Sequence, residues 1–415
     1  MTELVRDAKE DASMTLAHVV RATQANFPDA RYRPSLLRDA AVNARYGIDA
    51  GEHKISGNSD GTGTKPELAE RLFTETGDSA YFERPAFDLV AMVADDVARD
   101  GSFVVGIINN LDVNTAGDPP FVAALSRGLR RACDVGRFPL LNGETAELGY
   151  RAPGYGSLHL NWNATALQLI NERKMIDGSR LRPGQPIVGL RERSIRSNGL
   201  TRARRILEHA FLRIMRATDK RSYVAHHVRE QLGGLLSEDV ILRVLDATPA
   251  GTGFWEHQHL PWHKEFPWLT EQLLTPSTIY APLIYEAQGG VDGDVQIPLV
   301  SCAHVSGGGV PLKGQRMLER SGLGMRLESP FPDPAGIPEL IDLARRYPTS
   351  NGPLVTERTA CDQWNRGVGF LCVTEHAGHA SELAVLAAAL GYEAAIVGET
   401  TNERAIEWRG ERWTY

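Results

Sequence analysis

Residues 57–65 read Gly-Asn-Ser-Asp-Gly-Thr-Gly-Thr-Lys and combine one acid, Asp60, and one cation, Lys65, with hydroxyls and closely spaced glycines. The glycines Gly61 and Gly63 allow a tight turn that brings backbone N–H groups close to phosphate oxygens. Lysine adds a mobile point charge, and Mg²⁺ usually takes only one or two carboxylates beside phosphates. The spacing does not match a Walker A loop. A polyphosphate-binding loop and a Gly-rich hairpin turn with solvated charges are the two interpretations that the stretch leaves open.

Length and composition limit the class of protein. A chain of 415 residues predicts two domains of about 200 residues each. The net charge of −7 argues against general nucleic-acid binding, which needs a basic face. We find no apolar run of about 18 residues that could span a membrane and no secretory signal at the N-terminus.

The cysteines indicate the compartment. Cys133, Cys302, Cys361 and Cys372 are scattered without CxxC spacing, which favours reduced thiols in a cytoplasmic protein and no zinc site. A nucleophilic cysteine is the less favoured alternative.

Pro85 opens the clearest helix, whose apolar residues recur at spacings of three and four. Asp88 lies in its first turn, where a carboxylate suits the helix dipole. Asp95 and Asp96 border the apolar face, and paired acids there are costly unless a cation meets them. A solvated helix edge and a metal site are both open at these two residues.

Strands and helices alternate along the rest of the chain, which predicts an α/β or α+β architecture. Residues 1–50 look helical and end in turn residues at 46–51, and a short strand at 54–56 should lead into an Asp60 loop. Residues 182–186 are the best linker candidate. The other predicted strands are 104–108, 140–147 (entering a Gly turn), 159–167, 187–190, 367–373 and 394–398, and the other helices are 66–80, 119–135, one beginning at 200, and 380–390.

Two further segments can be explained by structure or by binding. Ser197-Asn198-Gly199 precedes a helix, so these residues can cap it or bind an anion at its N-terminus. His304 stands before Gly307-Gly308-Gly309, which is either a tight connection or a close backbone approach to a ligand. Residues 211–270 contain Trp255, His257, His259, Trp262, His263 and Trp268, which we interpret as a surface insertion with aromatic packing rather than a metal site.

The order of these motifs resembles the AIR synthetase family, phosphoribosylformylglycinamidine cyclo-ligase of purine biosynthesis. The resemblance runs from about residue 46 to about residue 400 and places the chain in the superfamily of formylglycinamidine synthetase, thiamine-phosphate kinase and selenophosphate synthetase. The co-linear motifs are Asp60-Gly-Thr-Gly-Thr-Lys65, Phe87-Asp88-Leu-Val-Ala-Met92, Gly143-Glu-Thr-Ala-Glu147, Ser197-Asn-Gly199, Leu274-Thr-Pro-Ser-Thr-Ile-Tyr280, Ala303-His-Val-Ser-Gly-Gly-Gly309 and Asn365-Arg-Gly-Val-Gly369.

The resemblance implies a two-domain AIR synthetase-like fold. An N-terminal α/β domain, residues 1–183, would form a barrel-like dimer core with a second subunit. A C-terminal α+β domain, residues 184–415, would carry the insertion at about 211–270. The ATP cleft would lie between the two domains of a cytoplasmic homodimer.

The resemblance also implies the chemistry. ATP would phosphorylate an amide-type oxygen of formylglycinamidine ribotide, and a substrate nitrogen would then close the imidazole ring and release phosphate and ADP. Such a reaction depends on positioning and on stabilisation of phosphoryl charge, and needs no protein nucleophile.

Carried over by motif, Asp60, Lys65, Asp96 and Glu144 would be the catalytic residues. Asp60, Asp96 and Glu144 would hold Mg²⁺, and Lys65 would contact the ATP phosphates. The remaining nucleotide-binding residues would be Gly61, Thr62, Gly63, Thr64, Asp88, Ser197, Asn198, Gly199, His304, Gly307, Gly308 and Gly309. Because both lie in an expected loop, Asp60→Asn and Lys65→Ala are predicted to abolish turnover without unfolding the protein.

Departures from the family pattern indicate a divergent member. A Gly-rich loop expected after Asp49-Ala50-Gly51 is missing, and Arg196 stands where the family has histidine. Arginine cannot carry a proton near neutral pH, although it can bind phosphate. A different phosphoryl-transfer reaction of the superfamily, or a non-catalytic nucleotide-binding scaffold, is therefore the alternative.

Overall fold

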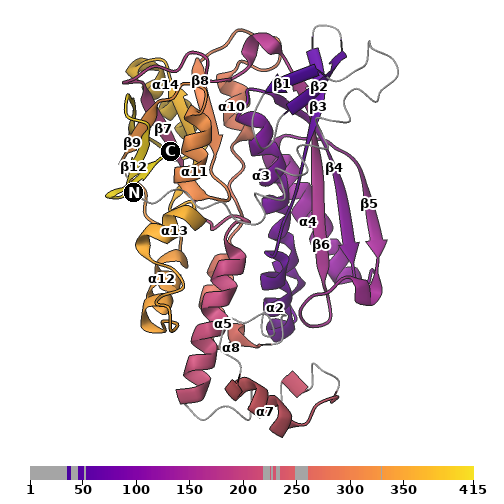
Figure 1. Ribbon diagram of the computed structural model, residues 1–415. Coiled ribbons are helices and arrows are strands. Elements are labelled where there is room, and N and C mark those ends of the chain that lie inside the picture. The colour runs from indigo at the N-terminus through magenta and orange to yellow at the C-terminus, as the bar shows by residue number, and fades with distance from the viewer. Residues whose placement is uncertain are drawn as a thin grey trace.

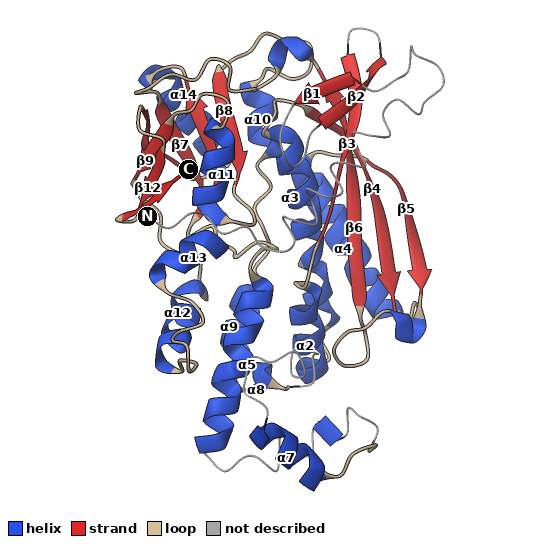
Figure 2. Ribbon diagram, in the orientation of Figure 1, coloured by secondary structure: helices blue, strands red, loops and turns tan. Residues whose placement is uncertain are grey.

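The structure is a computed structural model that describes residues 35–38, 45–50, 53–217, 225, 228–229, 234–247, 260–328 and 330–415. Its described strands form two sheets that lie on opposite sides of a layer of helices (Figures 1 and 2). The predicted fold class, a mixed α/β and α+β architecture, is confirmed. In the described part of the chain, no helix is both long and apolar enough to cross a membrane.

The first sheet has six strands in the order β1-β2-β3-β6-β4-β5. All its neighbours are antiparallel except β4 and β5, which are parallel. The strands are β1 Ser35–Arg38, β2 Arg45–Ala50, β3 His53–Gly61, β4 Phe103–Val113, β5 Leu140–Glu147 and β6 Leu160–Ile170.

Helix α3, Pro85–Ala98, packs on this sheet against β3, β4 and β6, beside α4, Pro119–Gly136. Nearly every residue of α3 is buried, including Asp88 and Asp95. On its other side α3 meets α10, Ala281–Ala287, of the C-terminal half. α3 therefore packs against elements of both halves of the protein.

The second sheet has seven strands in the order β13-β12-β9-β11-β7-β10-β8. Its neighbours are antiparallel except β9 and β12. The strands are β7 Pro186–Arg191, β8 Leu299–His304, β9 Gly324–Leu327, β10 Val368–Thr374, β11 Ala394–Thr401, β12 Ala405–Trp408 and β13 Glu411–Thr414.

Helices cover both faces of the second sheet. α14, Ala377–Ala389, packs on β7, β10 and β11, and α11, Gly309–Leu318, packs on β8, β9 and β12. The remaining described helices are α2 Pro66–Thr76, α5 Leu200–Ala217, α7 Glu238–Ala247, α8 Trp262–Glu265, α9 Pro267–Leu273, α12 Ile337–Arg346 and α13 Glu357–Gln363.

One large apolar cluster runs from Leu68 on α2 through α3 to Ala387 on α14, so the two halves share a core. A second cluster, which includes Ile187 and Trp408, fills the space under α11. The first sheet ends with Ile170 and the second begins at Pro186; the division of the chain after residue 183 stays a prediction, as does the barrel-like dimer.

Three local predictions are wrong. Within residues 1–50, the described segments 35–38 and 45–50 are strands rather than helix and turn. The strand that begins at His53 continues through Asp60 to Gly61, because it pairs with β6 along its whole length. Gly143 does not turn β5, because the strand stays paired with β4 on both sides of it, from Leu140 to Glu147.

The predicted insertion at 211–270 is only partly described. Trp255, His257 and His259 lie outside the described residues. Trp262 and His263 are buried, and Trp262 packs with Tyr155 on either side of the Arg71 guanidinium, 4.3 and 4.1 Å from the ring centroids. The predicted aromatic packing is therefore present there, but inside the molecule.

Glu70 on α2 makes stability depend on pH. Its carboxylate accepts backbone N–H groups of Tyr155 and Leu160, 2.8 and 3.2 Å away, and burial raises its pKa from 4.5 to about 8. The folded state therefore keeps a proton that the unfolded state loses above about pH 4.5, and the free energy of unfolding falls as pH rises between these two values.

We expect this single group to lower the stability by up to about 5 kcal/mol from pH 4.5 to pH 8. The Glu70→Gln variant loses an acceptor, but it has no proton to release. Urea unfolding at several pH values should therefore give a flatter stability profile for Glu70→Gln than for the parent chain. Parallel profiles for the two proteins would contradict the assignment to Glu70.

Candidate functional site

The candidate site lies where the loop after β3 meets the C-terminal half. Gly63 comes close to that half, because a Cβ on it would be 3.6 Å from the Ser197 carbonyl oxygen. A Cβ on Gly307, before α11, would be 3.5 Å from the Asn198 side-chain oxygen. The structure thus brings together three of the predicted motifs, which are far apart in sequence.

Two glycines around this meeting point lie close to other segments. A Cβ on Gly61 would lie 2.3 Å from the side-chain oxygen of the exposed Asn163, so that side chain would have to move. Gly309 has φ +59° and its Cβ would lie 1.9 Å from the Cys361 carbonyl oxygen. These positions let the backbone approach closely, which a phosphate cradle also needs.

Two buried polar atoms of the site lack a hydrogen-bond partner among the described residues. They are Ser197 Oγ and His304 Nε2. An unsatisfied buried polar group costs about 1–3 kcal/mol, so each one needs an explanation. A bound ligand that supplies a donor or an acceptor is such an explanation.

Asp96 orients His304. The imidazole Nδ1 lies 2.9 Å from Asp96 Oδ1, and the carboxylate can only accept, so Nδ1 carries the proton and Nε2 is left as an acceptor. Burial, together with the nearby Arg196, lowers the pKa of His304 to about 3, so the ring is neutral. Although burial opposes it, the charge of Arg99, 3.0 Å away, holds the pKa of Asp96 well below its ordinary value.

Lys65 lies elsewhere than the sequence predicts. Its ammonium is fully buried and donates to Asp88 Oδ1 at 2.7 Å and to the Thr275 carbonyl at 2.6 Å. Asp88 also accepts a hydrogen bond from Ser277. Burial lowers the pKa of Lys65 and raises the pKa of Asp88, and their mutual attraction opposes both shifts. This buried ion pair and its hydrogen bonds link α3 to residues 275–277.

Arg196 is likewise a structural cation rather than a phosphate ligand. Its guanidinium donates to Asp95 at 2.8 Å and to Glu192 at 2.7 Å, and all three side chains are fully buried. Asp95 accepts two further bonds, from the backbone of Tyr280 and Ala281. The backbone of Arg196 has φ +60°, a conformation that is uncommon outside glycine and that these bonds hold in place.

The three predicted metal ligands are not gathered in one place. Asp60 shares a face of β3 with Asn58, whose amide donates to the Val93 carbonyl of α3. Glu144 lies opposite Asn110, which lies opposite Asn163 and then Gly61, so it points to the other face of the sheet and is about 14 Å away along the strands. The described residues contain no group of three or more His, Cys, Asp or Glu side chains that could hold a metal ion.

The other predicted residues have these surroundings. Thr62 is buried and its hydroxyl donates to the Trp162 carbonyl at 3.3 Å. Asn198 donates to Met92 Sδ at 3.8 Å. Gly199 and Gly308 adopt positive φ, and Thr64 is exposed.

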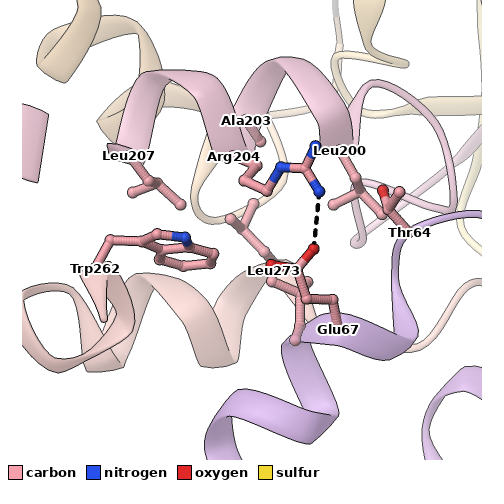
Figure 3. A pocket seen from close by; sticks show the side chains of 9 residues that line it. Thr64, Glu67, Leu200, Ala203, Arg204, Leu207, Trp262 and Leu273 are labelled. Carbon is pink, nitrogen blue, oxygen red and sulfur yellow. Dashed lines mark hydrogen bonds and ion pairs between the residues drawn. The ribbon is translucent and has the colours of Figure 1, made fainter. Parts of the chain in front are cut away.

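Thr64 borders a pocket between the two halves, which also includes Glu67, Arg204 and Trp262 (Figure 3). Arg204 spans it with an ion pair of 3.0 Å to Glu67. The indole N–H of Trp262 has no hydrogen-bond partner within the described part of the protein. Sequence patterns missed this pocket because its walls come from α2, α5 and α8.

Sequence reasoning also missed Lys313, four residues after Gly309 on α11. Lys313 is 9% exposed, and burial lowers its pKa to about 8. Asp96 and Asp60 attract its charge, and Arg316 and Arg99 repel it. Its distance in sequence from Asp60 and Asp96 leaves no local signal for this proximity.

Residues 237–409 match the family described as AIR synthase related protein, C-terminal domain. A phosphoribosylformylglycinamidine cyclo-ligase of Carboxydothermus hydrogenoformans is 25% identical over 370 residues, 88% of this chain and 87% of that protein. One from Synechococcus sp. strain CC9605 is 25% identical over 382 residues, 90% and 89% of the two chains. The crystal structure of thiamine-monophosphate kinase from Stenotrophomonas maltophilia K279a is 15% identical, with a TM-score of 0.47 over 96% of each chain.

The Lys65–Asp88 pair yields a prediction about stability. Lys65→Met leaves a buried carboxylate without its cation, which should lower the free energy of unfolding by about 3–5 kcal/mol. Replacing both residues, Lys65→Met with Asp88→Leu, should recover most of that loss. Urea unfolding of the single and double variants measures both effects.

Lys54→Met is the matched control, because Lys54 pairs with the half-exposed Glu172. It should cost less than about 1 kcal/mol. If Lys65→Met is no less stable than Lys54→Met, Lys65 is not a structural cation.

Proposed function

We propose that this chain, a divergent member of the AIR synthase-related proteins, is an ATP-dependent enzyme that converts formylglycinamidine ribotide to aminoimidazole ribotide. ATP would activate an amide-type oxygen, a substrate nitrogen would close the ring, and ADP and phosphate would leave. The enzyme would act as a cytoplasmic homodimer. Its ligands would be ATP, Mg²⁺ and the ribotide, with no nucleic acid or membrane partner.

The observation that carries the proposal is the meeting of the β3 loop, Ser197-Asn198 and Gly307–Gly309 around two unsatisfied polar atoms. Glycine-rich backbone with neighbouring hydroxyl and amide groups suits the phosphates of a nucleotide. His304 would accept a hydrogen bond from the ligand through Nε2, with Asp96 as its positioning residue. The residues present therefore fit a nucleotide.

The fit to Mg²⁺ is poorer. Asp96 already pairs with Arg99 and His304. Within one chain, Glu144 lies on the face of the sheet opposite to that of Asp60. We propose that Mg²⁺ enters only as a companion of the nucleotide phosphates, with Asp60 as the carboxylate that would hold it.

The homodimer proposal rests on the face of the first sheet that no described helix covers. α3 packs on the other face, and Ile55 and Val105 remain 43% and 41% exposed on the strands of the sheet. Apolar residues on an uncovered sheet face favour association with another sheet.

Arg196 favours a second candidate function, another ATP-dependent phosphoryl transfer on a different small amide or acid. The family histidine at this position has become a cation that is fixed between Asp95 and Glu192. A ring closure that needs a proton carrier there would lose it. A non-catalytic scaffold has no use for the unsatisfied polar atoms and is less favoured.

The deciding experiment incubates the pure chain with formylglycinamidine ribotide, ATP and Mg²⁺, and measures aminoimidazole ribotide and ADP together. We expect equal amounts of both products. The Asp60→Asn variant keeps an acceptor for the Gly61 N–H but loses the charge, and should lower turnover by about 100-fold or more.

Asp134→Asn, which changes an exposed acid on α4, is the control and should leave turnover unchanged. ATP binding without ring closure would favour the second candidate and direct the search to other small amides and acids. A chain that neither turns over nor binds ATP would leave only the scaffold.

A further inference from the structure

Two of the four cysteines stand directly opposite each other in the second sheet. Cys302 lies on β8 and Cys372 on β10, and the antiparallel register of these strands pairs the two residues. Both are buried, and neither is in a disulfide. Cys133 and Cys361, by contrast, lie on the helices α4 and α13. The strand register therefore creates a thiol pair that the scattered positions in the sequence do not reveal.

The backbone hydrogen bonds show which kind of cross-strand pair this is. The Val305 N–H donates to the Gly369 carbonyl oxygen at 2.9 Å, and these two residues continue the register of β8 and β10 as a hydrogen-bonded pair. Hydrogen-bonded and non-hydrogen-bonded pairs alternate along an antiparallel ladder. Cys302 and Cys372 lie three positions away, so they form a non-hydrogen-bonded pair, the kind that brings side chains closer together.

This geometry suits a disulfide. The Cα atoms of a non-hydrogen-bonded pair are about 4.5 Å apart, within the range of about 4.4–6.8 Å that disulfides span. The Cβ atoms of opposite residues are about 4.5–5.5 Å apart, and a disulfide brings them to about 3.5–4.5 Å. Both side chains leave the sheet on the same face. A bridge between them therefore needs a small approach of the two side chains and no change of register.

The thiol pair faces the core that the two halves of the protein share. Both cysteines belong to the large apolar cluster, whereas Ala303 and Leu371, the next pair along the strands, belong to the cluster under α11. Cys302 retains 6% exposure and Cys372 has none, so a small reagent reaches Cys302 first. Burial and, after it, the neighbouring Cys372 raise the pKa of Cys302 well above its ordinary value, so Cys302 is a thiol at neutral pH.

We propose that Cys302 and Cys372 are an oxidative modification site, at which a peroxide converts the two thiols to a disulfide between β8 and β10. The Cys302 sulfur attacks hydrogen peroxide, the O–O bond breaks, and a sulfenic acid and one water form. The Cys372 sulfur then attacks the sulfenic sulfur, the S–O bond breaks, and a second water leaves as the S–S bond forms. Two electrons pass from the thiols to the peroxide, which becomes two molecules of water.

The disulfide would fix β8 to β10 close to the candidate site. His304 follows Cys302 by two residues on the same face of β8, and its ring bonds Asp96. The bridge would also close the long loop that contains α11, β9, α12 and α13, which restricts the unfolded chain. The oxidised protein should therefore resist urea better than the reduced protein. The modification needs no nucleotide and is independent of the proposed function.

Peptide mapping of the folded, full-length chain tests the pairing. The chain is treated with hydrogen peroxide at mildly alkaline pH, which increases the thiolate fraction, alkylated in urea and digested with trypsin without reduction. Trypsin separates the four cysteines, because Cys302 falls in peptide 265–313, Cys372 in 367–404, Cys133 in 132–137 and Cys361 in 359–366. We expect 265–313 joined to 367–404, at a mass about 2 Da below the sum of the two, and released by dithiothreitol.

Urea unfolding of the oxidised and reduced chain is the second measurement, and its midpoint should rise on oxidation and return with dithiothreitol. Cys302→Ala should lose both the cross-link and the rise. Cys133→Ala, which removes a buried thiol on α4, is the matched control and should keep both. If neither Cys302→Ala nor Cys372→Ala folds, the peptide map of the parent chain decides alone.

Two results would overturn the proposal. One is recovery of peptides 265–313 and 367–404 only as separate species, whether alkylated or oxidised to sulfinic acid, after peroxide treatment of the folded chain. The other is a cross-link that leaves the urea midpoint unchanged or lowers it, because a bridge that strains the sheet does not use the native register.

Discussion

The carboxylates of α3 are the constraint on which the rest of the structure depends. Asp88 and Asp95 lie in the interior and Asp96 is partly buried, all on a helix that is buried on nearly all sides. A buried charge without a partner costs several kcal/mol, so each acid requires a cation or a set of donors. Those groups come from Lys65, from Arg196, and from Arg99 and His304, and all of them lie outside α3, Arg99 directly after its last residue.

This requirement determines where the two halves meet. Arg196 and His304 belong to the C-terminal half, and they reach acids on a helix that packs against the N-terminal sheet. The loop that carries Ser197 and Asn198 follows Arg196 directly, so the buried ion pairs also position the groups at the site. Arg196, whose charge stabilises the fold, and Ser197 and Asn198, which are proposed to bind the ligand, are therefore neighbours in the sequence.

Local patterns predicted the parts of the molecule that local physics decides. The periodicity of residues 85–97 predicted α3, and the warning that Asp95 and Asp96 need cations was correct. The motif order predicted a resemblance to AIR synthetases, and residues 237–409 match the AIR synthase related C-terminal domain. The sequence could not show that the Lys65 ammonium forms a buried ion pair with Asp88. That pair depends on the fold, which brings α3 close to Thr275. Nor could it show that Glu144 faces away from Asp60, because that depends on the strand register across β3, β6, β4 and β5.

The Asp95–Arg196–Glu192 cluster also restricts how these three positions can change during evolution. Its acids come from different halves of the chain, and each is fully buried beside one guanidinium. If Arg196 were replaced by a neutral residue, the buried carboxylates of Asp95 and Glu192 would both lose their cation. Evolution avoids such an intermediate only if Asp95 or Glu192 changes first. Substitutions at positions 95, 192 and 196 should therefore appear together on the branches of a family tree, and the arginine should mark a clade rather than recur at random.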